Sequence, residues 1–189
     1  MKDGLFETFW DNGQVRLRSN YKDGKPDGLW EDYDYEGNLY QTQEWKDGKL
    51  DGLWVWKGWF KENYKDGKLH GLRETSPDYG LYWGKENYKE GKEDGLWESY
   101  YDNGQLSFKE NYKEGKKEGL WESYDENGQL RFSRNYKNGK RDGLWEGYHK
   151  GQMWVKENYK KGKKDGLWEY YDEEGNLTET EEWKDGELV

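Results

Sequence analysis

The sequence predicts an all-β protein, an elongated twisted antiparallel β-meander of about eight tandem hairpin repeats. The tetrad Asp-Gly-Leu-Trp, or a near copy of it, occurs eight times in 189 residues, mostly 24 residues apart, with one spacing of 19 and one of 23. A second signature, Tyr or Trp followed by Lys, any residue and Gly, keeps step with the tetrad. Aromatic and turn-forming residues are abundant, whereas Ala, Ile and Cys are absent, and this composition favours strands over helices.

Repetition at this period is typical of arrays whose units bury their faces only against their neighbours. We therefore predict one repeat domain over residues 1–189, without an internal boundary. Its repeats are expected at about 3–26, 27–50, 51–69, 70–93, 94–117, 118–141, 142–164 and 165–188.

The repeat from Asp94 to Lys117 shows how each unit is expected to fold. Residues 96–101 form a short aromatic-rich run, and residues 106–112 form a second one. The segment between them contains Asn103-Gly104, a pair that accepts positive φ in a tight hairpin turn. Residues 113–119 supply two more glycines and several charges, which suit a second turn into the next hairpin.

Alternation along these strands assigns their faces. In the second strand, Leu106, Phe108, Glu110 and Tyr112 share one face, which we expect to be packed. In the first strand, the positions after the Trp, such as Ser99, vary between repeats, and we expect them to be exposed and to carry specificity.

Carboxylates recur one position after the Trp or its substitute, and lysines recur in the second signature. We expect the two series to pair across the sheet, each exposed pair contributing only ~0.2–1 kcal/mol. The carboxylate series is Glu7, Glu31, Glu74, Glu98, Glu122, Glu146 and Glu169. The lysine series is Lys22, Lys46, Lys65, Lys89, Lys113, Lys137, Lys160 and Lys184.

The charge balance bounds the partners. Low aliphatic content and a net charge of −10 would by themselves indicate disorder, but a disordered chain has no reason to keep Leu-Trp and Tyr-Lys pairs at fixed intervals. An acidic chain is repelled by nucleic acid and by anionic membrane surfaces. We expect a basic protein partner and no nucleic acid.

Location and oligomeric state follow from the same reading. The sequence has no apolar run of about 18 residues and no basic-then-apolar leader, so we expect no membrane span and a cytoplasmic protein. It would be secreted or surface-bound if Met1 replaces a removed signal peptide. The last strand carries Glu179, Glu181 and Glu182, which discourage edge pairing, so we expect a monomer when the protein is free.

Residues for catalysis are scarce. The only histidines, His70 and His149, lie in different repeats at turn positions, and no serine stands in a GxSxG setting. A glycosidase needs two singular carboxylates at a cleft, whereas the glutamates here form a repeated ladder. Calcium loops, P-loops and dinucleotide fingerprints are absent. We expect no enzyme activity, no catalytic residues, no metal and no cofactor.

Repeats three and four break the pattern. The third is five residues short and loses its Asn-Gly turn, and the fourth has Arg73 in place of the Trp and inserts Ser76-Pro77-Asp78. One interpretation is a tightened hairpin and a local bend. The other is a partner-facing aromatic patch, because exposed apolar clusters mark interaction sites. Its candidate partner-binding residues are Trp54, Trp56, Trp59, Phe60, Arg73, Tyr79, Tyr82 and Trp83.

The motif YKxGKxDGLW, as it stands at Tyr136 to Trp145, resembles the MORN repeat. The stretch from Tyr100 to Trp121 is similar to its bacterial variant, the repeat of the YwqK-type antitoxin family. The resemblance covers about the full chain. It implies an elongated antiparallel sheet that binds proteins, and it also implies an antitoxin or immunity protein that neutralises a toxin by direct contact. It carries over no catalytic residue.

Two functional hypotheses from different classes follow. The first is a non-enzymatic protein-binding scaffold of the antitoxin or immunity type. The second is a surface or cell-wall-associated module for glycan binding or adhesion, because Trp and Tyr platforms also stack on sugars. A third, a hydrolase using the Glu ladder, would require one Glu to matter far more than its equivalents.

Overall fold

The computed structural model describes residues 3–76 and 83–189, and these residues contain strands and turns but no helix. Within these ranges, therefore, no helix is long and apolar enough to cross a membrane. The chain separates into two compact units, residues 1–92 and 93–189, each of which is described by itself. The single domain expected over residues 1–189 stays a prediction.

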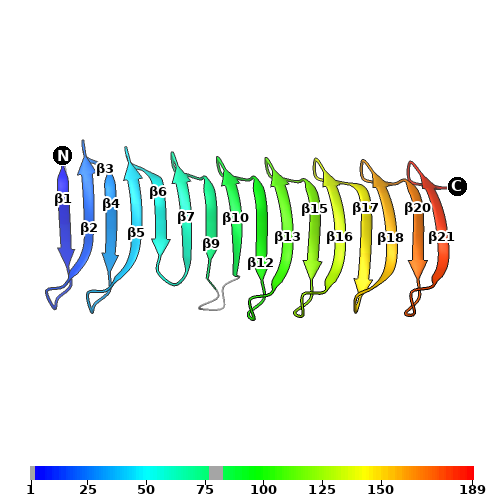
Figure 1. Cartoon of the computed structure of the whole chain (residues 1–189). Helices are drawn as coiled ribbons and strands as arrows, with labels where there is room; N and C mark the ends of the chain where they lie inside the picture. Colours follow the sequence, from blue (N-terminus) through cyan, green and yellow to red (C-terminus); the bar gives the residue numbers. More distant parts are fainter. Residues whose placement is uncertain (1–2, 77–82) are drawn as a thin grey trace. The chain divides into compact units, whose positions relative to one another are not determined.

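Unit 1 is an open antiparallel sheet whose long strands lie side by side in chain order (Figure 1). Its strands are β1 (Gly4–Phe9), β2 (Val15–Lys22), β3 (Lys25–Pro26), β4 (Gly28–Tyr33), β5 (Leu39–Lys46), β6 (Lys49–Trp56), β7 (Phe60–Lys65), β8 (Lys68–Leu69), β9 (Gly71–Thr75) and β10 (Trp83–Lys89). The two-residue strand β11 (Lys92–Glu93) stands at the boundary between the units.

Unit 2 has the same organisation, again with antiparallel long strands in chain order. Its strands are β12 (Gly95–Tyr100), β13 (Leu106–Lys113), β14 (Lys116–Lys117), β15 (Gly119–Tyr124), β16 (Leu130–Lys137), β17 (Lys140–His149), β18 (Gln152–Lys160), β19 (Lys163–Lys164), β20 (Gly166–Tyr171), β21 (Leu177–Lys184) and β22 (Glu187–Leu188). The predicted all-β antiparallel meander of hairpin repeats is confirmed.

Two kinds of turn alternate along each unit, and the tight one is not at the Asn-Gly pair. In the Asn103-Gly104 turn only the glycine has positive φ, 84°, and its N–H donates to the Tyr101 carbonyl at 2.9 Å. At the opposite end of the hairpin, Glu114 and Gly115 have φ values of 50° and 78°. Positive φ at both central residues defines the two-residue turn whose twist matches that of the strands.

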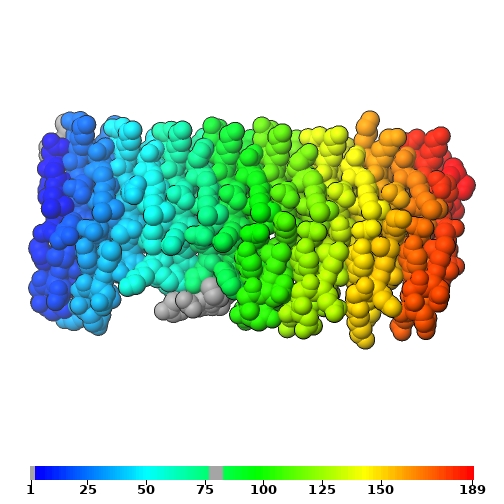
Figure 2. Space-filling view, in the orientation of Figure 1, coloured from blue at the N-terminus to red at the C-terminus, as the bar shows by residue number. Residues whose placement is uncertain are grey.

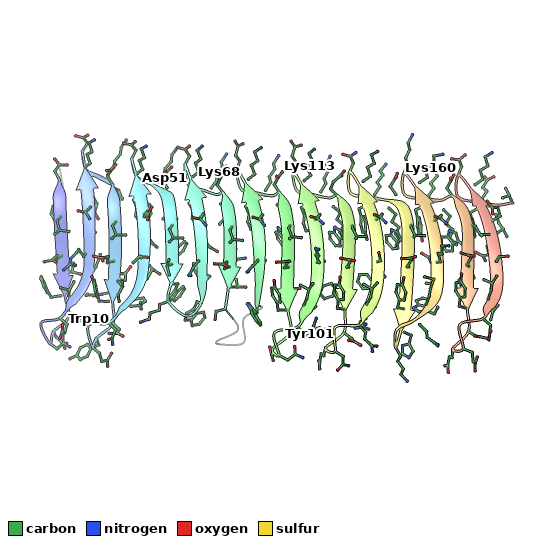
Figure 3. The ribbon with its side chains drawn as sticks, in the orientation of Figure 1. Trp10, Asp51, Lys68, Tyr101, Lys113 and Lys160 are labelled. Atoms are coloured by element: carbon green, nitrogen blue, oxygen red, sulfur yellow. The ribbon has the colours of Figure 1, made fainter. Side chains whose placement is uncertain are left out.

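The two kinds of turn lie at opposite ends of the strands, along the two sides of the sheet that we call its edges here. In unit 1, Asp51 and Lys68 lie on the edge opposite Trp10, and in unit 2, Lys113 and Lys160 lie on the edge opposite Tyr101 (Figure 3). In each unit considered by itself, the end of the strands that carries these lysines therefore holds the two-residue turns such as Glu114-Gly115. The two-residue turn at Lys150-Gly151 is an exception, because it lies at the other end of the strands.

Strand register identifies the packed face. Trp97 lies opposite Glu110 and Ser99 lies opposite Phe108, so all four side chains share the face of Tyr112. This confirms the predicted packed face for Phe108, Glu110 and Tyr112, but not for Leu106, which lies opposite Tyr100 on the other face because a bulge at Ser107 shifts the register. The expectation that Ser99 is exposed is wrong, because Ser99 shares the packed face and is only 3% exposed.

Aromatic rings form the core of this single layer. In unit 2, neighbouring rings of a ladder have centroids 5.1–5.3 Å apart, and Trp121, Trp145 and Trp168 are buried. Each such pair contributes about 0.5–1.5 kcal/mol beyond its buried area. The rings bury one another sideways along the sheet, so no second layer is needed. The ladder consists of Tyr112, Trp121, Tyr136, Trp145, Tyr159 and Trp168.

An asparagine joins each hairpin to the next. The Asn158 carbonyl accepts hydrogen bonds from the Asp165 N–H at 3.1 Å and the Trp168 Nε1–H at 3.0 Å, while its side-chain amide donates to the Leu167 carbonyl at 2.7 Å. Gly166 has φ 107°, and a Cβ there would lie 3.3 Å from that of Asn158. We call this arrangement the asparagine clamp. The hydrogen bond from the asparagine side-chain amide to a backbone carbonyl recurs at Asn20, Asn63, Asn111 and Asn135.

The first residue of each tetrad orders the following turn. Its side chain accepts the backbone N–H of the first residue of the two-residue turn that ends the same repeat, as Asp142 does from Lys161 at 2.9 Å. His70 fills the same position and accepts from the Glu90 N–H through Nδ1 at 3.4 Å, which confirms its turn role. The other acceptors are Asp3, Asp27, Asp51, Asp94, Glu118 and Asp165.

We predict that Asn135→Ala destabilises the protein by about 1 kcal/mol, because it leaves the partly buried Leu144 carbonyl without the amide that donates to it at 3.0 Å. Urea unfolding followed by tryptophan fluorescence measures the change. Asn127→Ala is the matched control, because the Asn127 side chain makes no hydrogen bond in the described part of the chain. Equal loss in both variants would argue against the clamp.

We predict a pH-dependent gain from Glu110→Gln. Burial raises the pKa of Glu110, against the opposing effects of the Tyr112 hydroxyl and Lys117. The folded state therefore favours the protonated form of Glu110. The stability that this form contributes is fully present below the ordinary pKa of Glu and is lost as the pH rises through the raised pKa. The variant should melt at a higher temperature than the parent near pH 7, and the difference should vanish near about pH 3. A constant difference across this range would contradict the assignment.

Candidate functional site

The shortened third hairpin brings its aromatic residues together. Strand β6 ends at Trp56 and β7 begins at Phe60, directly opposite it. The loop between them closes through the Trp59 N–H, which donates to the Trp56 carbonyl at 2.9 Å, with Gly58 at φ 83°. Figure 2 shows the surface of unit 1 recessed at this turn relative to the turn between β4 and β5.

Four of the predicted residues form one ring cluster. Trp56 and Trp59 are stacked, with centroids 5.1 Å apart and planes 20° apart. Phe60 meets Trp54 and Trp56 edge to face, at 5.1 and 5.8 Å. All four side chains are half-buried, so they keep apolar surface that a partner can cover.

The cluster borders an open hollow of about 430 Å³, which we call the aromatic hollow. Its wall includes Trp56, Trp59, Phe60, Thr75 and Trp83. Sequence spacing therefore placed Trp83 correctly beside the cluster, although it comes from β10. The other two predicted residues, Tyr79 and Tyr82, lie outside the described residues.

Arg73 is held elsewhere. Its guanidinium pairs with Glu62 at 2.7 Å and with Glu86 at 3.0 Å, at the ladder position that Trp occupies in other repeats. The hydroxyls of Tyr64 and Tyr88 donate to the same two carboxylates, and burial, followed by these bonds, raises the pKa of both tyrosines. Arg73 does not line the aromatic hollow.

Trp54 also differs from its equivalents. Its Nε1–H is buried and has no hydrogen-bond partner among the described residues, whereas Trp30, Trp121, Trp145 and Trp168 donate to the carbonyl of a clamp asparagine. At the end of the preceding repeat, Glu44 stands where the asparagine would be, and a Cβ at Gly52 would clash with the Glu44 side chain. The third repeat thus departs from the clamp as well as from the hairpin length.

Sequence reasoning missed a second irregular region in repeat seven. Two hollows, of about 450 and 460 Å³, lie around Trp154, whose side chain is 51% exposed. His149 lines both hollows. Its predicted turn position is wrong, because it is the last residue of β17 and pairs with Gln152, and the two-residue turn with positive φ is formed by Lys150 and Gly151. The 23-residue spacing in the sequence marks this repeat, because the turn between β17 and β18 is one residue shorter than the corresponding turn in the regular repeats.

The predicted pairing of the glutamate series with the lysine series is wrong, because other cations lie opposite the glutamates. Lys113 lies opposite Lys116 at the two-residue turn, whereas Glu98 lies opposite Lys109. The glutamates therefore meet cations four residues earlier than predicted, as when Lys156 contacts Glu169 at 2.9 Å. Similarly, Arg18 contacts Glu7 and Glu31 at 2.9 and 3.3 Å. No cluster of three His, Cys, Asp or Glu side chains suited to a metal ion occurs in residues 3–76 and 83–189.

These features define a tandem β-hairpin repeat protein. The family model of the MORN repeat variant matches residues 2–23, 26–47, 93–114, 117–138 and 164–185, more than half of the chain. The protein therefore belongs to the MORN repeat variant family, and repeats of this kind suggest a scaffold for binding. No curated protein matches the chain. The unmatched segments 48–92 and 139–163 contain the third, fourth and seventh repeats, where the hollows lie.

We predict that Arg73→Leu destabilises the protein by roughly 3–5 kcal/mol, because it leaves the buried Glu62 carboxylate unpaired. Adding Glu62→Gln and Glu86→Gln to this variant should recover most of the loss, because no unpaired charge then remains. Chemical unfolding of the single and triple variants measures both effects. An unchanged midpoint in Arg73→Leu would show that the ion pairs are not structural.

Proposed function

We propose that the protein is a non-enzymatic binding scaffold, most concretely an antitoxin or immunity protein that neutralises a partner protein by direct contact in the cytoplasm. The observation that carries the proposal is the stacked pair of Trp56 and Trp59 beside the open aromatic hollow. In regular repeats, rings and polar groups are committed to neighbouring repeats. In the third repeat, aromatic surface remains at the sheet edge for another molecule.

The chemistry of this surface supports a protein partner. Half-buried Trp and Phe rings are the anchors that dominate protein interfaces when a partner completes their burial. Lys57 and Lys61 also line the hollow, so the chain's excess negative charge lies outside it. We infer that the hollow takes an apolar anchor while the acidic remainder of the surface orients a basic partner, such as a nuclease-like toxin.

A second candidate, glycan binding, is favoured by one observation. The Trp56 and Trp59 planes differ by only 20°, and such a flat aromatic surface also accepts the apolar face of a sugar ring. The two candidate functions differ in whether Trp56 and Trp59 bind a protein or a polysaccharide.

The test is affinity capture from the native cell lysate with the intact protein and with Trp56→Ala combined with Trp59→Ala. We expect one protein to co-purify in near-equal amount with the parent and to be lost from the double variant. That protein should arrest growth when expressed alone, and co-expression of the parent, but not of the double variant, should restore growth.

Phe9→Ala is the control, because Phe9 is 57% exposed in the same unit but does not line the hollow. It should retain the partner, and thermal unfolding should show that the double variant is folded. Equal loss in Phe9→Ala would move the contact surface away from the third repeat. Retention on cell-wall polysaccharide without a protein partner would replace the antitoxin proposal with glycan binding.

A further inference from the structure

A second hollow of about 460 Å³ lies in unit 2, between strands β16, β17 and β18. It opens on the packed face, because Trp145, Phe132 and Val155 in its wall belong to that face by register. We call it the arginine hollow. The lining residues that matter for the argument are Phe132, Arg134, Arg141, Trp145, Gly147 and Trp154.

Gly147 makes room for the Trp154 ring in the wall of the hollow. It stands where other repeats have Ser99 and Ser123, and it is buried. A Cβ at this position would lie 2.8 Å from the Trp154 ring. Trp154 occupies the extra position in the bulge of β18, so its ring lies against the Gly147 backbone and half of its surface remains exposed.

Arg134 is an uncompensated charge in this hollow. It is half-buried, and its guanidinium carbon lies 3.7 Å from the Phe132 ring centroid and 4.9 Å from that of Trp145. Equivalent positions hold Glu110 and Glu157, which accept tyrosine hydroxyls. Arg134 forms no ion pair and no hydrogen bond to any described residue. Burial, with repulsion from Arg141, lowers the pKa of Arg134 against the opposing effects of Tyr136, Glu157 and Tyr159.

Arg141 brings a second guanidinium to the same ring. The guanidinium carbon of Arg141 lies 4.2 Å from the Trp145 ring centroid, and one N–H donates a hydrogen bond to the Tyr159 hydroxyl at 2.8 Å. Most of the guanidinium donors therefore remain available. The lining contains three arginines, with Arg131, against the carboxylates of Glu146 and Glu157. With histidine neutral, the hollow therefore carries one excess positive charge.

We propose that the arginine hollow binds a side-chain carboxylate from an acidic segment of a protein partner, with an adjacent apolar residue of that segment packed on Trp154. Guanidinium groups fixed against aromatic rings are suited to planar carboxylates. A single negative charge balances the hollow, whereas a doubly charged phosphate would exceed its positive excess.

This inference shares with the proposed function only the assumption that the array binds proteins. It concerns a different unit and a different hollow, and a titration with synthetic peptide tests it without the native partner. Loss of partner capture through Trp56 and Trp59 would therefore leave it standing.

The experiment follows the tryptophan indole N–H signals of the full ¹⁵N-labelled chain by nuclear magnetic resonance. The probe is a capped pentapeptide, Gly-Gly-Glu-Phe-Gly, and its twin has Gln in place of Glu. Trp154→Phe assigns the Trp154 signal. We expect the Glu peptide to shift the Trp145 and Trp154 signals saturably, and the Gln twin to bind at least about tenfold more weakly.

Arg134→Gln should weaken binding of the Glu peptide by about tenfold or more. The midpoint of thermal unfolding should stay unchanged or rise, because the substitution removes an unpaired charge. Lys140→Gln is the matched control: it removes one exposed positive charge from the neighbouring strand β17, outside the hollow, and should change affinity less than twofold. Equal binding of the two peptides, or equal loss in both variants, would overturn the proposal. Tighter saturable binding of inorganic phosphate than of the Glu peptide would also overturn it in favour of a phosphate site.

Discussion

The clamp between an asparagine and the following tetrad is the interaction on which the rest of the structure depends. In one place it satisfies the Asn158 carbonyl, the Trp168 indole and the Leu167 carbonyl, and it fixes the tryptophan on the packed face. Because the sheet has a single layer, the Trp and Tyr rings have only one another to pack against, and their spacing is set by this clamp. A clamp that repeats with the sequence gives a ladder that repeats with it.

This regularity also explains where binding surfaces arise. A repeat that obeys the pattern uses its indole, amide and carboxylate groups on its neighbours and has little left for a partner. The third repeat is five residues short and follows Glu44 in place of a clamp asparagine, and the seventh has Gly147 where other repeats have a buried serine. Hollows lined by aromatic rings lie at both repeats, and in the seventh the hollow also contains Arg134, which forms no ion pair or hydrogen bond with a described residue.

Much of the candidate site was predictable, and the misses have definite causes. Trp54, Trp56, Trp59 and Phe60 cluster because a short loop leaves them few places to go, so proximity in sequence was a sufficient guide. Arg73 could not be assigned in the same way, because its partners Glu62 and Glu86 come from two flanking strands. Trp154 was passed over because its exposure depends on a bulge and on a missing Cβ across the strand pair.

The sequence by itself determined the fold class, the repeat length and the packed face, because a pattern written eight times specifies local turns and strand alternation repeatedly. Only the tertiary structure decided which cation meets each glutamate, that Ser99 is buried, and where the hollows open. These features depend on strand register and bulges. A shift of one residue between strands changes which side chains face each other, and that shift leaves no direct mark on the sequence.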